Sequence, residues 1–311
     1  MPRAHVRNFR FAAAAACLAA IGFVAFYFPY ATDAEPSPAE TAKTIAFYQQ
    51  AYTASASGNP EEELYTSVAA AAAHALQVEQ NLREFITQNG LQNRKVLEIG
   101  AGQGSLQDLV VDYTGLDISP TVRRFFHKPF VLGSATALPF PNDQFDATWS
   151  VFVLEHIPTP EQALREMRRV TRDGGYIYLY PAWSCSSWKA DGYEARPYSD
   201  FNLIGKMVKA SIPIRSSNLY HALYTAPIRA LRFISYAVSS SPTRLHYSRL
   251  TPNYEKYWMG DSDAASSIDR YEALLWFESR GDECVNCRRS PFGSITESVN
   301  DPRLIVRVRK H

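Results

Sequence analysis

This sequence contains few cysteines and has almost no net charge. Four of the 311 residues are cysteine, and 32 Lys and Arg against 31 Asp and Glu leave a formal net charge of +1. A near-neutral chain gives no support to nucleic-acid binding as its main role, so we expect no nucleic-acid partner. With 46% hydrophobic residues, the composition is that of a globular protein with one large or two small cores.

The few cysteines do not form a metal site that the sequence can identify. Cys17 lies in an apolar stretch and Cys185 stands alone, whereas Cys284 and Cys287 form a single C-x-x-C. A structural zinc ion needs about four ligands, and no second pair or nearby histidine supplies them. We therefore expect no metal. For the C-x-x-C we favour two thiols at a strand edge, with a redox pair or a local disulfide as the alternatives.

Acidic residues are absent from the first 32 positions, where the basic residues are Arg3, Arg7 and Arg10. The arginines precede an uncharged stretch of 19 residues, Phe11–Pro29, which can just span the hydrocarbon core of a membrane. We favour a membrane anchor or targeting helix for residues 1–32. A cleaved signal peptide, an organelle transit peptide and a helix lying on the membrane surface stay open.

Residues 33–90 have the composition of a linker that leads into helices. A stretch rich in Pro, Ser and Ala is interrupted by TAKTIAFYQQAY, which predicts a short helix. Strong helix formers over residues 61–89 predict a second helix, which Asn89-Gly90 ends.

Short strand-like runs then alternate with helical segments. β-branched and apolar residues predict strands at KVLEIG, DYTGLDIS, FDATWSVFV and GYIYLYPA. Between the last two, Thr159 and Gln162 form a T-x-x-Q capping box around Pro160, so a helix should begin there and end at Gly174-Gly175. A further helix is predicted over residues 262–280, followed by the strand-like DECVNC and RLIVRVR. This alternation indicates an α/β fold with an open, doubly wound and mostly parallel sheet.

The stretch KVLEIGAGQGSL, residues 95–106, ends the first of these strands in three glycines. Backbone N–H groups at such a turn lie at the carboxyl edge of a parallel sheet, where ligands bind. The spacing is G-x-G-x-G, not the G-x-G-x-x-G of dinucleotide sites, and the acid Glu98 lies two residues before Gly100, so an NAD-dependent oxidoreductase is disfavoured. Asp117 ends the next strand, where a carboxylate can accept hydrogen bonds from both hydroxyls of a ribose.

Four stretches in this order resemble the class I S-adenosylmethionine-dependent methyltransferases, and within them the quinone-methyltransferase-like type 11 group. They are VLEIGAGQG (96–104), YTGLDIS (113–119), GSATALPFPNDQFDATWSVFVLEHI (133–157) and EMRRVTRDGGYIYLYP (166–181). The resemblance implies S-adenosylmethionine as cofactor. It also implies a Rossmann-like methyltransferase fold with a seven-stranded-type sheet over residues 91–311.

The resemblance also assigns cofactor contacts. The glycine loop would wrap the methionyl part of the cofactor, with Glu98 near its ammonium group, and Asp117 with the adjacent Ile118 would hold the ribose. The other expected contacts are Gly100, Gly102 and Gly104 in the loop, Ser134 and Ala135 beside the adenine, and Ser150 beneath the methionyl group. The family usually has an acidic or amide residue where Ser134 stands, so we expect cofactor affinity to be weaker by about 1 kcal/mol.

No catalytic base is evident from the sequence alone. An oxygen acceptor needs its proton removed, and His156, just past the third strand, is the one candidate that we name. The alternative, which the sequence favours, is that His156 shapes the pocket.

Residues 183–260 form a predicted insertion, or lid, over the acceptor side. Within residues 183–250, nine Lys and Arg face three acids, with tyrosines and phenylalanines interleaved. Residues 218–238 predict an amphipathic, largely apolar helix pair. A membrane-proximal lid fits this composition better than a nucleic-acid cleft does, and an ordinary lid with a solvated basic face is the alternative.

The sequence therefore predicts a methyltransferase acting on a small or lipid-linked acceptor. Residues 257–281 resemble the end of type 11 methyltransferases that are associated with bacterial surface-glycan synthesis. This resemblance implies a lipid-linked saccharide or another membrane-resident acceptor first, and a quinone-like phenol second. The alternative is a catalytically inactive S-adenosylmethionine-binding membrane protein that supports a partner enzyme. The positive-inside rule would carry the domain across a membrane, but the methyl donor is made in the cytosol, so we favour membrane association on the cytoplasmic face.

Overall fold

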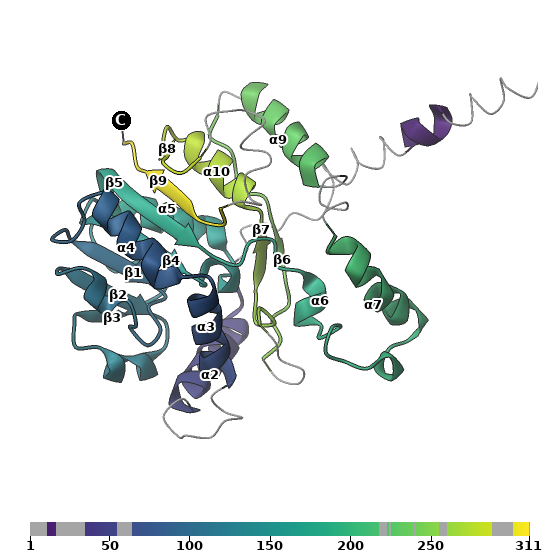
Figure 1. The fold of residues 1–311 in the computed structure, drawn as a ribbon, viewed down its shortest axis with the longest axis horizontal. Helices are drawn as coiled ribbons and strands as arrows, with labels where there is room; N and C mark the ends of the chain where they lie inside the picture. Colours follow the sequence, from purple (N-terminus) through teal and green to yellow (C-terminus); the bar gives the residue numbers. More distant parts are fainter. Residues whose placement is uncertain are drawn as a thin grey trace, which may run out of the picture.

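The structure is a computed structural model of the chain. It describes residues 11–16, 35–54, 64–217, 223, 225–238, 241–254, 260–287 and 301–310. Figure 1 shows a central sheet with helices on both faces, and a second group of elements to the right of the sheet in this view.

The sheet has seven strands in the order β3-β2-β1-β4-β5-β9-β8. The first five pair in parallel, whereas β9 runs antiparallel to β5 and β8 antiparallel to β9. The strands are β1 (Val96–Ile99), β2 (Tyr113–Asp117), β3 (Phe130–Leu132), β4 (Phe145–Val151), β5 (Thr171–Tyr180), β8 (Glu283–Cys284) and β9 (Leu304–Arg307). The predicted open, mostly parallel sheet is confirmed. Its order reverses between β1 and β4, the point where such sheets bind ligands.

Apolar side chains pack on both faces of the sheet. α4 (Val78–Gln88) covers the face that carries Val96. α5 (Pro160–Val170) and α10 (Arg270–Glu278) cover the face that carries Leu97. Because neighbouring residues of a strand point to opposite sides, β1 contributes to both layers, as a doubly wound fold requires.

The remaining elements lie before, between and after these layers. They are α2 (Pro38–Ala54), α3 (Leu64–Ala75), η1 (Gln107–Leu109), η2 (Pro120–Phe125), η3 (Leu154–His156), α6 (Ser187–Ala190), η4 (Tyr198–Asp200), α7 (Leu203–Arg215), α9 (Ala226–Val238), β6 (Tyr247–Arg249) and β7 (Ser266–Ile268).

The helix predicted over residues 61–89 is instead two helices. α3 and α4 are separated at Gln77, whose φ of 51° puts it in the left-handed region and breaks the hydrogen-bonding pattern. The predicted end at Asn89-Gly90 is confirmed, since Gly90 adopts a φ of 62° there.

The predicted limits of the next helix are partly wrong. α5 does begin at Pro160, but the Thr159 side chain makes no capping hydrogen bond, and Gln162 donates to the carbonyl of Thr136 instead of closing a capping box. The helix ends at Val170, before the two glycines. Gly174, at a φ of 70°, lies within β5, close to where the pairing of β4 and β5 shifts register.

The helix predicted over residues 262–280 is shorter than expected. α10 starts at Arg270 because the Asp269 side chain caps the N–H of Tyr271. The residues before it form β7, which pairs with β6 in a two-stranded antiparallel sheet that the sequence did not predict. The strands predicted in DECVNC and RLIVRVR are confirmed as β8 and β9.

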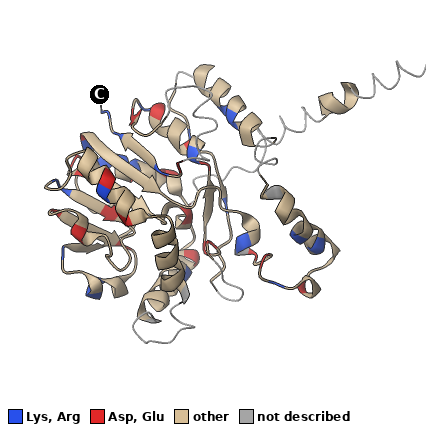
Figure 2. Cartoon of the chain, viewed as in Figure 1, with Lys and Arg blue, Asp and Glu red and all other residues tan. Residues whose placement is uncertain are grey.

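The predicted insertion between β5 and α10 contains α6, η4, α7, α9 and β6. Of the expected helix pair over residues 218–238, α9 is described and residues 218–222 and 224 lie outside the described ranges. Figure 2 shows basic residues and no acidic residues along α7.

The predicted N-terminal helix over residues 1–32 lies mostly outside the described ranges, and only residues 11–16 of it are described, as helix. Among the residues that the structure describes, no helix combines the length and apolar character needed to cross a membrane.

The C-x-x-C differs from our favoured interpretation. Cys284 and Cys287 are joined by a disulfide, so the expectation of two free thiols is wrong and the local disulfide is the alternative that holds. Cys185 is buried and free.

Candidate functional site

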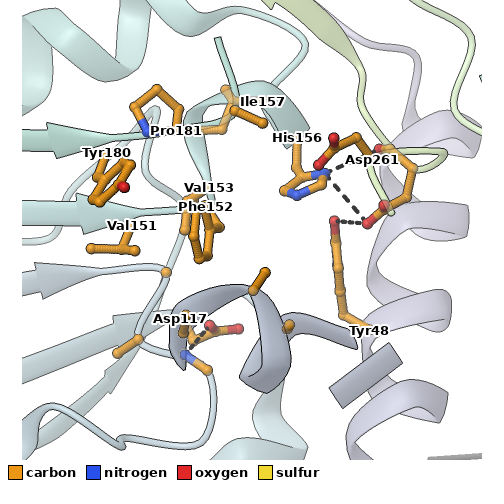
Figure 3. A pocket seen from close by; sticks show the side chains of 18 of the residues that line it. Tyr48, Asp117, Val151, Phe152, Val153, His156, Ile157, Tyr180, Pro181 and Asp261 are labelled. Carbon is orange, nitrogen blue, oxygen red and sulfur yellow. Dashed lines mark hydrogen bonds and ion pairs between the residues drawn. The ribbon is translucent and has the colours of Figure 1, made fainter. Parts of the chain in front are cut away.

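A large cavity opens at the carboxyl edge of the sheet, between the strand ends and the helices α2 and α3 (Figure 3). Its volume is about 1580 Å³. Pockets for one drug-sized ligand measure roughly 300–1,000 Å³, so this cavity has room for two ligands side by side.

The glycine loop after β1 borders the cavity and needs its glycines for steric reasons. Gly100 and Gly102 both line the cavity, with φ of 73° and 49°. A Cβ on Gly100 would lie 2.2 Å from a methyl carbon of Val153. The N–H of Gly102 donates to Asp117 Oδ2 at 2.9 Å, so the loop is tied directly to the end of β2.

Asp117 is buried at the end of β2 and lines the cavity. Its Oδ1 accepts a hydrogen bond from the N–H of Ser119 at 2.8 Å, which fixes the orientation of the carboxylate. Burial raises the pKa of Asp117, although the backbone hydrogen bonds oppose the rise. Each oxygen keeps a further lone pair for a ligand, and the adjacent Ile118 lines the same wall.

Glu98 also faces the cavity, from within β1. The hydroxyl of Tyr113 donates a hydrogen bond to Glu98 Oε2. Burial raises the pKa of Glu98 to about 8, even though the hydrogen bond from Tyr113 favours the ionised form. A strongly shifted pKa of a group that lines a cavity marks Glu98 as a candidate functional residue.

Ser134 and Ala135 lie on the cavity wall after β3. The Ser134 hydroxyl accepts a hydrogen bond from the N–H of Thr136 at 3.2 Å and lies 2.9 Å from the Thr136 hydroxyl. Its short side chain is therefore already engaged locally, which reduces what it can offer a ligand.

Two residues predicted to contact the ligand do not line the cavity, namely Gly104 and Ser150. A Cβ on Gly104 would lie within 3.0 Å of Gln107 and Phe126, so this glycine serves the packing of the loop. Ser150 is buried within β4. The residues that follow it, Val151, Phe152 and Val153, form the wall instead.

His156 lines the cavity from η3, and its side chain is 13% exposed. Nδ1 lies 3.3 Å from Asp263 Oδ2 and 3.3 Å from the Asp263 carbonyl oxygen. Burial lowers the pKa of His156, but the carboxylates of Asp263 and Glu155 raise it, with a net rise above its ordinary value.

Three tyrosines of α2 and α3 close the other side of the cavity, and no sequence motif predicted them as site residues. The Tyr65 ring centroid lies 5.8 Å from that of Tyr48 and 6.0 Å from that of Tyr52. Burial, and then the Asp117 carboxylate, raise the pKa of Tyr52, which keeps its hydroxyl protonated. The available signal was the four-residue spacing of Tyr48 and Tyr52, which places both on one helix face.

The segment after the insertion supplies a second unexpected part of the wall. Asp261 and Asp263 both line the cavity, and Asp261 pairs with Lys189 at 2.8 Å. No local motif marks these acids, because their partners lie far away in the sequence.

Comparison with known proteins shows a family match for the middle of the chain. Residues 97–179 match Methyltransf_11, a family described as "Methyltransferase domain". An uncharacterized methyltransferase of Mycobacterium tuberculosis (strain H37Rv) is 37% identical over 102 residues, which cover 29% of this chain and 40% of that protein. The demethylmenaquinone methyltransferase of Renibacterium salmoninarum is 38% identical over 95 residues, 28% of this chain and 40% of that protein. The chain thus spans about two fifths of the length of these relatives.

Among solved structures, the matches include an amino pentose methyltransferase from Micromonospora echinaspora with bound S-adenosylmethionine. It is 17% identical, covers 34% of this chain and 50% of that chain, and has a TM-score of 0.32.

Proposed function

We propose that this chain, whose residues 97–179 form a class I S-adenosylmethionine-dependent methyltransferase domain, transfers a methyl group from S-adenosylmethionine to a small-molecule acceptor. The observation that carries the proposal is the single cavity of about 1580 Å³ that joins the glycine loop and Asp117 to His156 and the tyrosines. It has room for both a donor and an acceptor.

The residues of this cavity fit the cofactor. The glycine loop and the buried acids Glu98 and Asp117 line the same cavity, and Gly100 has no room for a side chain, since a Cβ there would lie 2.2 Å from a methyl carbon of Val153. Asp117 would accept the ribose hydroxyls, and Glu98 would pair with the ammonium group of the methionyl part. Ser134 and Ala135 would border the adenine.

When bound, the cofactor supplies an electrophilic methyl group, and the chain positions the acceptor and excludes water. Tyr48, Tyr52 and Tyr65 are buried or half-buried and form the side of the cavity opposite the strand ends. They cover the cavity on that side, and the Tyr48 ring lies 6.2 Å from that of His156.

More narrowly, we propose that the methyl acceptor is linked to a lipid. Residues 201–254 contain seven Lys and Arg and no Asp or Glu. α7 exposes the large apolar side chains Leu203, Ile204, Met207 and Ile214. A basic, apolar surface is suited to an anionic membrane. A quinone-like acceptor is the second form, supported by the name of the Renibacterium salmoninarum relative.

Calorimetric titration of the full chain with S-adenosylmethionine, its demethylated product and NAD tests the donor. Micromolar binding of the first two, lost in Asp117→Ala while the thermal unfolding midpoint is kept, is expected. Binding of NAD alone would refute the proposal. Function in cells that survives Asp117→Ala would instead favour the alternative of an inactive membrane protein that supports a partner enzyme.

A further inference from the structure

We propose that Asp263 positions His156 as the general base for a methyl acceptor that bears a hydroxyl group. The inference rests on the proposed methyl transfer and adds to it a positioning residue and the chemical class of the acceptor. Asp263 comes from the segment between the insertion and β7, far outside residues 97–179.

Asp263 is held between His156 and α2. Its side chain is 1% exposed, and its Oδ2 accepts a hydrogen bond from the Tyr48 hydroxyl at 3.0 Å while lying 3.3 Å from His156 Nδ1. Its carbonyl oxygen lies 3.3 Å from the same nitrogen. With two acceptor oxygens facing it, Nδ1 carries the proton of the neutral imidazole, so the lone pair is on Nε2.

The lone pair of His156 Nε2 points into the cavity. In Figure 3 the Nδ1 side of His156 carries the dashed lines, and the other ring nitrogen points away from them into the cavity. Nε2 is 4.0 Å from Glu155 Oε1, which is too far for a hydrogen bond. That oxygen accepts from the N–H of Ala182 at 2.9 Å instead.

The segment that leads to His156 contacts the glycine loop through Val153. Val153, three residues before His156, packs its side chain against Gly100. A ligand cradled by the loop and an acceptor beside Nε2 would therefore be neighbours.

The charges around His156 suit a proton acceptor. The groups that face it are Asp263 and Asp261 from the segment before β7, Glu155 from η3, and Tyr48 from α2, whose ring centroid is 6.2 Å away. The carboxylates stabilise an imidazolium more than an imidazole. Burial and the nearby Asp263 raise the pKa of Tyr48, so its hydroxyl stays protonated and keeps donating to Asp263.

A hydroxyl acceptor needs this arrangement, because its oxygen is a weak nucleophile until its proton is removed. As the acceptor oxygen bonds to the methyl carbon, the carbon–sulfur bond breaks and the hydroxyl proton passes to Nε2 of His156. The positive charge thus moves from sulfur to the imidazolium, which Asp263 stabilises. A neutral amine attacks with its own lone pair and can lose its proton to water afterwards, so it has no need of a buried base.

The acceptor class is tested with S-adenosylmethionine carrying a ¹³C-methyl group. The full chain is incubated with this donor and a lipid and small-molecule cell extract, and the ¹³C shift of the transferred methyl is read by NMR. A methoxy product is expected. An N-methyl, S-methyl or C-methyl product would overturn the acceptor class.

The role of Asp263 is tested without the cofactor. Side-chain ¹⁵N NMR of the full chain, assigned with His156→Gln, should show His156 protonated on Nδ1 when neutral. Asp263→Asn should lower the titration midpoint of His156 by about one pH unit. Tyr48→Phe should lower it less, because Asp263 remains. Asp261→Asn, two residues away, is the matched charge control and should also shift it less.

The transfer rate gives the second readout for the same variants. Asp263→Asn should lower kcat about 10²-fold at neutral pH with KM changed less than threefold, and should shift the acidic limb of the pH–rate profile. A neutral His156 protonated on Nε2, or a titration midpoint unchanged in Asp263→Asn, would overturn the positioning role. Calorimetry on the same samples separates this from the proposed function, since an absence of cofactor binding refutes only the latter.

Discussion

Glu98 is a buried acid whose protonation should set how tightly the cofactor binds. Burial raises its pKa to about 8, so the free protein holds it neutral at pH 7. An ammonium group beside it favours the ionised form, and binding below pH 8 therefore releases a proton. Affinity should rise by up to about tenfold per pH unit from pH 6 to 8, then fall as the ligand's own amino group deprotonates near pH 8.

Calorimetric titrations of S-adenosylmethionine at several pH values check this prediction. Glu98→Gln removes the titrating group and should flatten the profile below pH 8, while weakening binding at pH 8. A wild-type affinity that is constant between pH 6 and 8 would contradict the role of Glu98.

Gly100 should be far less tolerant of substitution than another glycine of the same backbone conformation. Gly100→Ala incurs the cost of a positive φ, about 1 kcal/mol, and a clash of roughly 1–3 kcal/mol with Val153. Gly90→Ala is the matched control, because its φ is 62° and nothing lies within 4 Å of its Cβ position. Urea unfolding should show a loss of about 2–4 kcal/mol for Gly100→Ala against about 1 kcal/mol for Gly90→Ala. Equal losses would show that the Val153 contact is unimportant.

At the residue scale, the groups that could be predicted are those that belong to a local sequence motif. Gly100, Gly102, Glu98 and Asp117 were predicted at this edge of the sheet and do line one cavity, because strand and turn chemistry fix their places. Whether they bind the cofactor stays a prediction. Asp263 could not be predicted, since its hydrogen bond with Tyr48 joins residues 215 positions apart.

Among the elements, α9 is tied to α10 and its N-cap residue by two ion pairs, Arg229 with Asp269 and Arg232 with Glu272. Arg232 Nε and Nη2 bond the two oxygens of Glu272 at 2.7 and 3.0 Å, with the side chains 14% and 9% exposed. Burial raises the pKa of Glu272, and Arg232 opposes the rise. Arg232→Met leaves a buried carboxylate without its main partner and should cost about 3 kcal/mol in the free energy of unfolding.

Urea unfolding measures this cost, with Arg83→Met as the control. Arg83 pairs with Glu79 at 2.6 Å, but both side chains are 59% exposed, so its loss should cost less than about 0.5 kcal/mol. The double variant Arg232→Met/Glu272→Leu should recover most of the stability. No recovery would show that the charge left on Glu272 is not the cause.

Element boundaries were predictable where a single residue imposes the backbone, as at Pro160 and Gly90. Element boundaries could not be predicted where a side chain can form a hydrogen bond either within its own element or with a distant segment. Gln162 reaches Thr136 on the neighbouring segment in place of the helix end. Asp269 delays the start of α10, which frees Ser266–Ile268 to pair as β7. The helix and strand propensities of the residues cannot fix such boundaries, because tertiary contacts override them.

At the scale of the whole molecule, the lead-in helices join the site. Residues 33–90 were predicted as a linker with helices, yet Tyr48, Tyr52 and Tyr65 line the same cavity as the glycine loop. The carbonyl of Tyr52 accepts a hydrogen bond from Arg124 at 2.5 Å, which connects α2 to η2 beside the sheet. A ligand in the cavity therefore touches both the sheet and the helices that cover it.

Ligand binding should accordingly stabilise α2 and α3 against opening. A ligand that binds only the closed form at 100 times its Kd adds about 2.7 kcal/mol to the cost of opening. Hydrogen–deuterium exchange of the full chain should slow in Pro38–Ala54 and Leu64–Ala75 when S-adenosylmethionine is added. α7 (Leu203–Arg215) contributes no residue to the cavity and is the internal control. Protection confined to the glycine loop and strand ends would mean that α2 and α3 open independently of the cofactor, and that the tyrosines serve the acceptor alone.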